Sequence, residues 1–98
     1  MIRFVYHPEA EAEFAAAVDH YRVEAGATIA DRFVHQVDVA VIALLRDPTA
    51  CPIIRGCVRR QRIWKFPYDV LFRAEDDCVT IIAVAHHARE PEYWAKHI

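Results

Sequence analysis

Residues 66–94 decide the fold of this chain, and they read Phe-Pro-Tyr-Asp-Val-Leu-Phe-Arg-Ala-Glu-Asp-Asp-Cys-Val-Thr-Ile-Ile-Ala-Val-Ala-His-His-Ala-Arg-Glu-Pro-Glu-Tyr-Trp. Residues 68–74 are rich in aromatic and β-branched side chains, residues 75–77 form an acidic break, and residues 79–85 are a nearly unbroken apolar run. This pattern predicts a hairpin of two strands. Because the second strand is apolar on both of its faces, we expect it to lie inside the sheet.

Polar and aromatic groups crowd the exit of the second strand. His86, His87 and Arg89 follow it directly, and Tyr93 and Trp94 come just after a proline. Proline stops a strand from continuing in the ladder. We expect the last eight residues to form a short helical turn, with Trp94 folded back on the domain.

These features occur in a characteristic order: a Phe-Pro-Tyr bend, an apolar strand, an acidic turn, a second apolar strand and the exit motif His-x-x-Arg-x-Pro-x-Tyr-Trp. The order resembles the ParE branch of the RelE/ParE toxin superfamily, the small toxins of bacterial type II toxin–antitoxin pairs. The resemblance implies a strand, a helical hairpin and a three-strand meander, with a cognate antitoxin as partner. Folds of this kind host both gyrase poisoning and ribosome-dependent RNA cleavage, so fold alone does not choose between them.

The N-terminal part of the chain predicts a strand and a helix. Residues 2–6 alternate in the manner of a short strand. Pro8 suits the first turn of a helix, where its missing N–H costs nothing, and three glutamates follow near the positive end of the helix dipole. Apolar residues then recur at helical spacing as far as Gly26, a natural stop. We therefore expect a first helix over residues 8–25.

A second amphipathic helix follows after a very short connection. Thr28 and Asp31 resemble a capping box at its start, and Asp47-Pro48 ends it. Two helices joined so closely must fold back antiparallel. We expect both apolar stripes to pack on the sheet.

The middle of the chain completes the predicted sheet. Residues 48–56 read as an irregular loop, and residues 58–66 read as a strand. Val58 and Ile63 cannot share a face under strict alternation, so we expect a bulge between them. The predicted fold class is α+β in the order β-α-α-β-β-β, with an antiparallel helical hairpin on a small, mainly antiparallel sheet. It forms one domain over residues 1–98.

Composition limits the function classes that are possible. The chain has 98 residues, of which 55% are apolar and only two are glycine, so disorder is not expected. No apolar run is long enough to cross a membrane, and the N-terminus lacks the plan of a signal peptide, so we expect a cytoplasmic protein. Cys51, Cys57 and Cys78 are odd in number and have no metal-binding spacing, which predicts reduced thiols with packing roles.

Charge is strongly segregated along the chain although the formal net charge is only −2. Residues 9–47 hold eight acidic and three basic side chains, whereas residues 55–74 hold six basic side chains against Asp69 alone. The middle strands therefore form a basic patch that suits an acidic protein segment or phosphates. The residues expected to bind an antitoxin or a target are Arg59, Arg60, Arg62, Lys65, Arg73, Arg89, Tyr93 and Trp94.

A catalytic interpretation stays open beside the binding one. RNA cleavage without a metal needs a base, cations around the phosphate and an acid for the leaving oxygen. If the protein is a nuclease, the candidate residues are His86, His87, Arg73, Arg89 and Tyr93. Adjacent histidines on a strand point to opposite faces, so we expect no metal site. No Gly-rich phosphate loop, Ser nucleophile motif or helix-borne zinc motif is present, and we expect no cofactor.

The resemblance sets the functional expectation. It implies the toxin component of a type II toxin–antitoxin system, neutralised by a cognate antitoxin and inhibiting DNA gyrase. One alternative is a RelE-like endoribonuclease that acts on ribosome-bound mRNA. Another is a degenerate member that binds its antitoxin without being toxic. A pI near 6.3 is low for a protein that binds RNA, which favours the gyrase inhibitor over the RelE-like nuclease.

Overall fold

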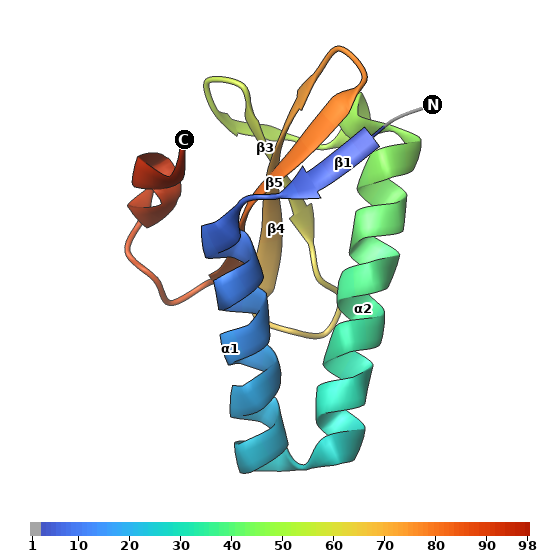
Figure 1. Cartoon of the computed structure of the whole chain (residues 1–98), viewed down its shortest axis with the longest axis vertical. Helices are drawn as coiled ribbons and strands as arrows, with labels where there is room; N and C mark the ends of the chain where they lie inside the picture. The colour runs from blue at the N-terminus through green and yellow to red at the C-terminus, as the bar shows by residue number, and fades with distance from the viewer. Residues whose placement is uncertain (1–2) are drawn as a thin grey trace.

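The computed structural model describes residues 3–98 and contains a helical hairpin packed on a five-stranded sheet (Figure 1). Its elements are β1 (Arg3–Tyr6), α1 (Pro8–Ala25), α2 (Ala27–Arg46), the 3₁₀ helix η1 (Pro48–Ala50), β2 (Ile53–Arg55), β3 (Val58–Arg62), β4 (Tyr68–Glu75), β5 (Cys78–His86) and the 3₁₀ helix η2 (Tyr93–His97). The spatial order of the strands is β1-β5-β4-β3-β2. The predicted α+β architecture is confirmed, although residue 2 of the predicted first strand lies outside the described residues.

The start of α1 and the turn between the two helices form as predicted, whereas the start of α2 does not. The Nδ1 atom of His7 accepts a hydrogen bond of 3.1 Å from the Glu9 amide, which caps α1, and Pro8 occupies the first turn. Gly26, at φ 92°, forms the whole connection to α2. Gly26 itself is the residue at the cap of α2, and no side chain caps that helix. The predicted capping role of Thr28 is therefore wrong, because the cap position is Gly26, two residues before Thr28.

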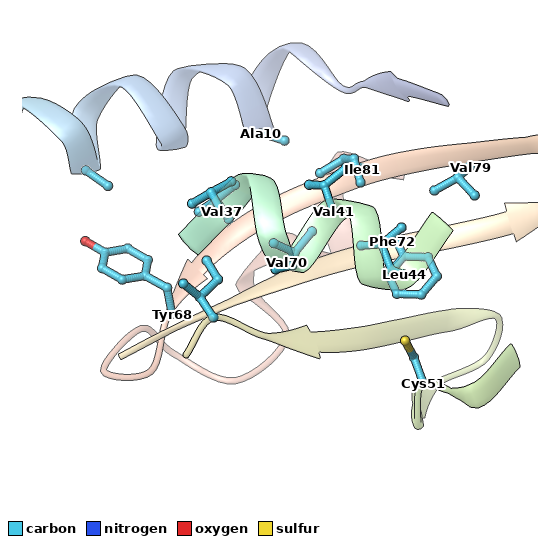
Figure 2. Packing of buried hydrophobic residues seen from close by; sticks show 14 of the residues in the cluster. Ala10, Val37, Val41, Leu44, Cys51, Tyr68, Val70, Phe72, Val79 and Ile81 are labelled. Carbon is cyan, nitrogen blue, oxygen red and sulfur yellow. The ribbon is translucent and has the colours of Figure 1, made fainter. Parts of the chain in front are cut away.

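The main core lies between α2 and the inner face of the sheet. Phe33, Val37 and Leu44 are buried along one stripe of α2 and belong to one cluster with Val70 and Phe72 of β4. Figure 2 shows side chains of this cluster meeting between the helices and the strands. The apolar periodicity of the second helix thus correctly predicted which face is buried.

Strand β5 is buried on both faces, as its composition predicted. It pairs in parallel with β1 and antiparallel with β4. Phe72 of β4 lies opposite Ile81, and Leu71 lies opposite Ala83, so Ile82 is one extra residue in β5. This bulge turns both Ile82 and Ala83 to the outer face of the sheet, away from the helices.

Two predictions for the middle of the chain are wrong. The bulge expected between Val58 and Ile63 does not exist, because β3 and β4 keep a regular register and β3 ends at Arg62. Val58 belongs to the outer cluster and Ile63 to the inner one, which is what strict alternation gives. The predicted loop over residues 48–56 also contains η1 and the edge strand β2.

The C-terminal segment covers part of the outer face. Trp94 is only 5% exposed and packs with Val58, Leu71 and Ile82 in a second apolar cluster. The Nδ1 atom of His97 lies 3.2 Å from the Ile82 carbonyl oxygen, so the ring donates to that oxygen. The predicted fold-back of Trp94 is confirmed. Within the described part of the chain, no helix combines the length and hydropathy needed to cross a membrane.

Candidate functional site

A hollow of about 400 Å³ lies on the outer face of the sheet beside the buried Trp94. Its walls come from β3, β4, the end of β5 and the segment that leads to η2. Its charged and titratable lining includes Arg60, Arg62, Asp69, His86, His87 and Arg89. The C-terminal segment covers part of the outer face and forms one wall of this hollow, which we call the sheet hollow.

Strand alternation sends two arginines into the sheet hollow. Val58 packs in the outer cluster, and Arg60 and Arg62 follow it at steps of two along β3, so they share its face. Neither guanidinium makes an ion pair with any residue between 3 and 98. Two cations without an ion-pair partner on one concave face attract an acidic ligand locally, although Asp69, Glu90 and Glu92 line the same hollow.

A histidine and an aspartate meet inside the sheet hollow. The Nε2 atom of His87 lies 3.1 Å from an Oδ1 atom of Asp69, and the Asp69 side chain is only 13% exposed. His86 is oriented differently, with its ring edge-on to Tyr68 at 4.9 Å and its Nδ1 accepting from the Ala88 amide. The two adjacent histidines therefore have separate partners.

Tyr93 has its hydroxyl buried rather than presented to a ligand. Within residues 3–98 the oxygen makes no hydrogen bond of good geometry, although the Glu13 carboxylate lies close enough to act on its pKa. Burial raises the pKa of the Tyr93 phenol strongly, the nearby Glu13 carboxylate raises it further, and the Arg89 guanidinium, 3.9 Å from the ring centroid, opposes the shift. Glu13 also accepts a hydrogen bond of 2.9 Å from the Val84 amide. This arrangement suits packing and makes Tyr93 a poor proton donor at neutral pH.

Three of the predicted binding residues lie away from the sheet hollow. Arg59 donates to the Cys51 carbonyl oxygen at 2.6 Å and so supports the loop before β2. Arg73 is near the other end of β4, where it pairs with Glu75 at 3.4 Å. Lys65 lies in the turn between β3 and β4. Arg60, Arg62, Arg89, Tyr93 and Trp94 line the hollow, as do the two predicted histidines.

Burial limits the predicted binding role of one residue. Trp94 was expected to bind an antitoxin or a target, yet it fills the apolar cluster beneath the hollow. Its indole therefore shapes the site from below, and removing it would alter the floor of the hollow.

Two contacts of the site were missed by sequence reasoning. Arg55 of β2 forms an ion pair of 2.9 Å with Glu92, which ties the edge of the sheet to the C-terminal segment. Nothing in the sequence signals this pair, because the two residues are 37 positions apart. The pairing of Asp69 with His87 had a signal, since alternation along β4 places Asp69 on the outer face with Leu71.

Comparisons with known proteins agree with this fold. The model of the family described as the ParE toxin of type II toxin–antitoxin system, parDE, matches residues 4–91. No curated protein matches significantly. A solved structure titled "Chromosomal ParDE TA system from P. aeruginosa" contains a similar chain with a TM-score of 0.77 and 22% identity, covering 88% of this chain and 96% of that one. At that identity the structural likeness shows the fold alone.

Proposed function

Because the chain belongs to the ParE toxin family of type II toxin–antitoxin systems, we propose that it arrests growth by binding DNA gyrase and that a cognate antitoxin neutralises it. The family match over residues 4–91 carries this proposal. Inhibition of a topoisomerase requires a complementary surface and no proton transfer by the inhibitor. The buried hydroxyl of Tyr93 and the pI near 6.3 both fit such a role better than they fit RNA cleavage.

The antitoxin is the proposed ligand of the sheet hollow. Arg60 and Arg62 have no ion pair within the described residues and face the same concave surface. An extended acidic segment of the antitoxin would neutralise both cations there, and an amphipathic helix would enlarge the contact. A stable complex of this kind buries roughly 1,600 Å² in total.

A second candidate function has one specific observation in its favour. His87 and Asp69 form a pair, and two unpaired arginines line the same hollow. In a ribonuclease, such a histidine removes the proton of a 2′-hydroxyl while arginines stabilise the phosphate. The reaction also needs an acid for the leaving oxygen. Tyr93 does not suit that role because its hydroxyl is buried.

Expression of the chain without its antitoxin separates the candidates. A gyrase-binding toxin stops growth and leaves mRNA uncut, and co-expression of the antitoxin restores growth. His87→Ala retains the effect, because that ring has no part in the action. New mRNA 5′ ends that vanish with His87→Ala would assign the nuclease function instead. Normal growth with a folded wild-type protein would assign a non-toxic member that only binds its antitoxin.

A further inference from the structure

A second, larger hollow lies on the other side of the molecule from the C-terminal segment. It has a volume of about 830 Å³ and is formed by the first turns of α2 and by the turn that joins β3 to β4. Trp64 and Phe66 line it from the turn, and Ile29 lines it from the helix. Figure 1 shows the β3–β4 connection passing beside α2 toward the tip of the hairpin. We call this hollow the Trp64 groove.

Trp64 is held out from the surface by its turn. Its side chain is 63% exposed, more than any other aromatic side chain in residues 3–98. The Phe66 amide donates to the Ile63 carbonyl oxygen at 3.3 Å, which closes a four-residue turn with Trp64 and Lys65 at its centre. The Ile63 amide donates in turn to the Tyr68 carbonyl oxygen. The indole thus extends from a hydrogen-bonded turn on a rigid sheet.

The turn carries strain that a glycine would avoid. Lys65 has φ 67°, in the left-handed region that favours glycine. Its Nζ atom lies 4.7 Å from the centroid of the Trp64 ring, close enough for a cation–π contact. A lysine in this place restricts the indole before any partner arrives, which lowers the entropy cost of binding. Strain retained beside an exposed aromatic side chain points to a binding role.

The Trp64 groove differs from the sheet hollow in place and in charge. The two share no lining residue. The sheet hollow presents unpaired arginines, whereas Asp31 lies beside Arg32 and Lys65 around the groove. Arg32 and Lys65 make no ion pair with another described residue. An aromatic anchor with a rim of mixed charge is typical of contact with a folded protein surface rather than with an acidic tail.

We propose that the Trp64 groove is the surface with which this toxin grips its protein target, and that the target supplies an apolar side chain for the groove and a carboxylate for Arg32 or Lys65. The inference rests on the proposed function, because it requires that the toxin act on a protein. It places the target-binding surface away from the sheet hollow, where the antitoxin's acidic segment is proposed to lie.

The test compares three full-length variants for growth arrest, for binding to purified DNA gyrase and for co-purification with the antitoxin. Trp64→Ala removes the anchor and lies on the surface, so it leaves the fold intact. It should abolish growth arrest and weaken gyrase binding by roughly 30-fold or more. Arg32→Glu should weaken both effects without touching the indole. Val23→Ala, an exposed apolar residue outside the groove, is the control and should act as wild type.

Each outcome decides between distinct conclusions. Loss of growth arrest by Trp64→Ala, with antitoxin binding and thermal unfolding unchanged, supports the proposal. Full growth arrest by Trp64→Ala overturns it, and escape of that variant from the antitoxin would assign the groove to the antitoxin. If the wild type stops growth but does not bind gyrase, the gyrase assignment fails. The effect of Trp64→Ala on growth arrest then still tests whether the Trp64 groove binds the target. If the folded wild type does not stop growth, both proposals fall.

Discussion

Replacing Phe33 with Ala tests the packing of α2 on the sheet. The ring is fully buried. Its centroid lies 5.1 Å from that of Tyr21, 5.2 Å from that of Phe66, 5.1 Å from that of Tyr68 and 6.1 Å from that of Phe14. Truncation of a buried phenylalanine costs about 3–5 kcal/mol, and lost aromatic contacts place this site near the top of that range. A loss of about 4–5 kcal/mol is a large part of the roughly 5–15 kcal/mol that stabilises a small domain.

Urea unfolding followed by circular dichroism measures this effect. With a slope of about 1.5 kcal/mol/M, the midpoint should fall by about 3 M. Phe33→Leu refills most of the cavity and should cost only about 1–1.5 kcal/mol. Val39→Ala, on the exposed side of the same helix, should stay within about 0.5 kcal/mol of wild type. If Phe33→Ala loses less than about 1 kcal/mol, the helix does not pack as described.

Three further predictions concern the outer face of the sheet. Tyr93→Phe removes a buried hydroxyl without a partner, so the free energy of unfolding should stay equal or rise by up to about 1 kcal/mol in urea unfolding at pH 7. Burial raises the pKa of Tyr93 above 10.0, so the folded state keeps the phenol proton to a higher pH than the unfolded state. Wild-type stability should therefore fall as the pH rises above about 10. Tyr93→Phe should show a smaller fall. The double variant Arg60→Glu, Arg62→Glu should bind the antitoxin more weakly and with less salt dependence, as measured by calorimetry. Unchanged affinity would mean that the acidic segment does not bind in the sheet hollow.

The second helix was predictable because its apolar residues recur at helical spacing, and the last strand was predictable because it is an almost unbroken apolar run. The stripe through Phe33 and Leu44 gave the buried face of α2, and the apolar run around Ile81 gave a strand covered on both faces. In both cases the burial of apolar side chains determines the local structure, and the positions of apolar residues in the sequence show which side chains are buried. The order of these elements then implied the family fold.

The parts that were missed depend on geometry that no local pattern records. Strand β2 has only three residues between a proline and a glycine, too few to show a period. The bulge at Ile82 could not be predicted, because the residues around it are all apolar and the extra residue leaves no mark in the pattern. The contact of Arg55 with Glu92 depends on the path of the C-terminal segment. The composition of the sheet hollow was therefore predictable only in part, from alternation along β3 and β4.

We propose that this toxin-family chain inhibits DNA gyrase, and a supercoiling assay with purified gyrase tests that proposal most directly. Toxin separated from its antitoxin and refolded should block supercoiling of relaxed plasmid in proportion to its concentration. His87→Ala and Tyr93→Phe should inhibit as strongly as wild type, because neither ring transfers a proton in that action. Unaffected supercoiling at a large excess of folded toxin, together with cleavage of ribosome-bound mRNA that His87→Ala abolishes, would contradict the account.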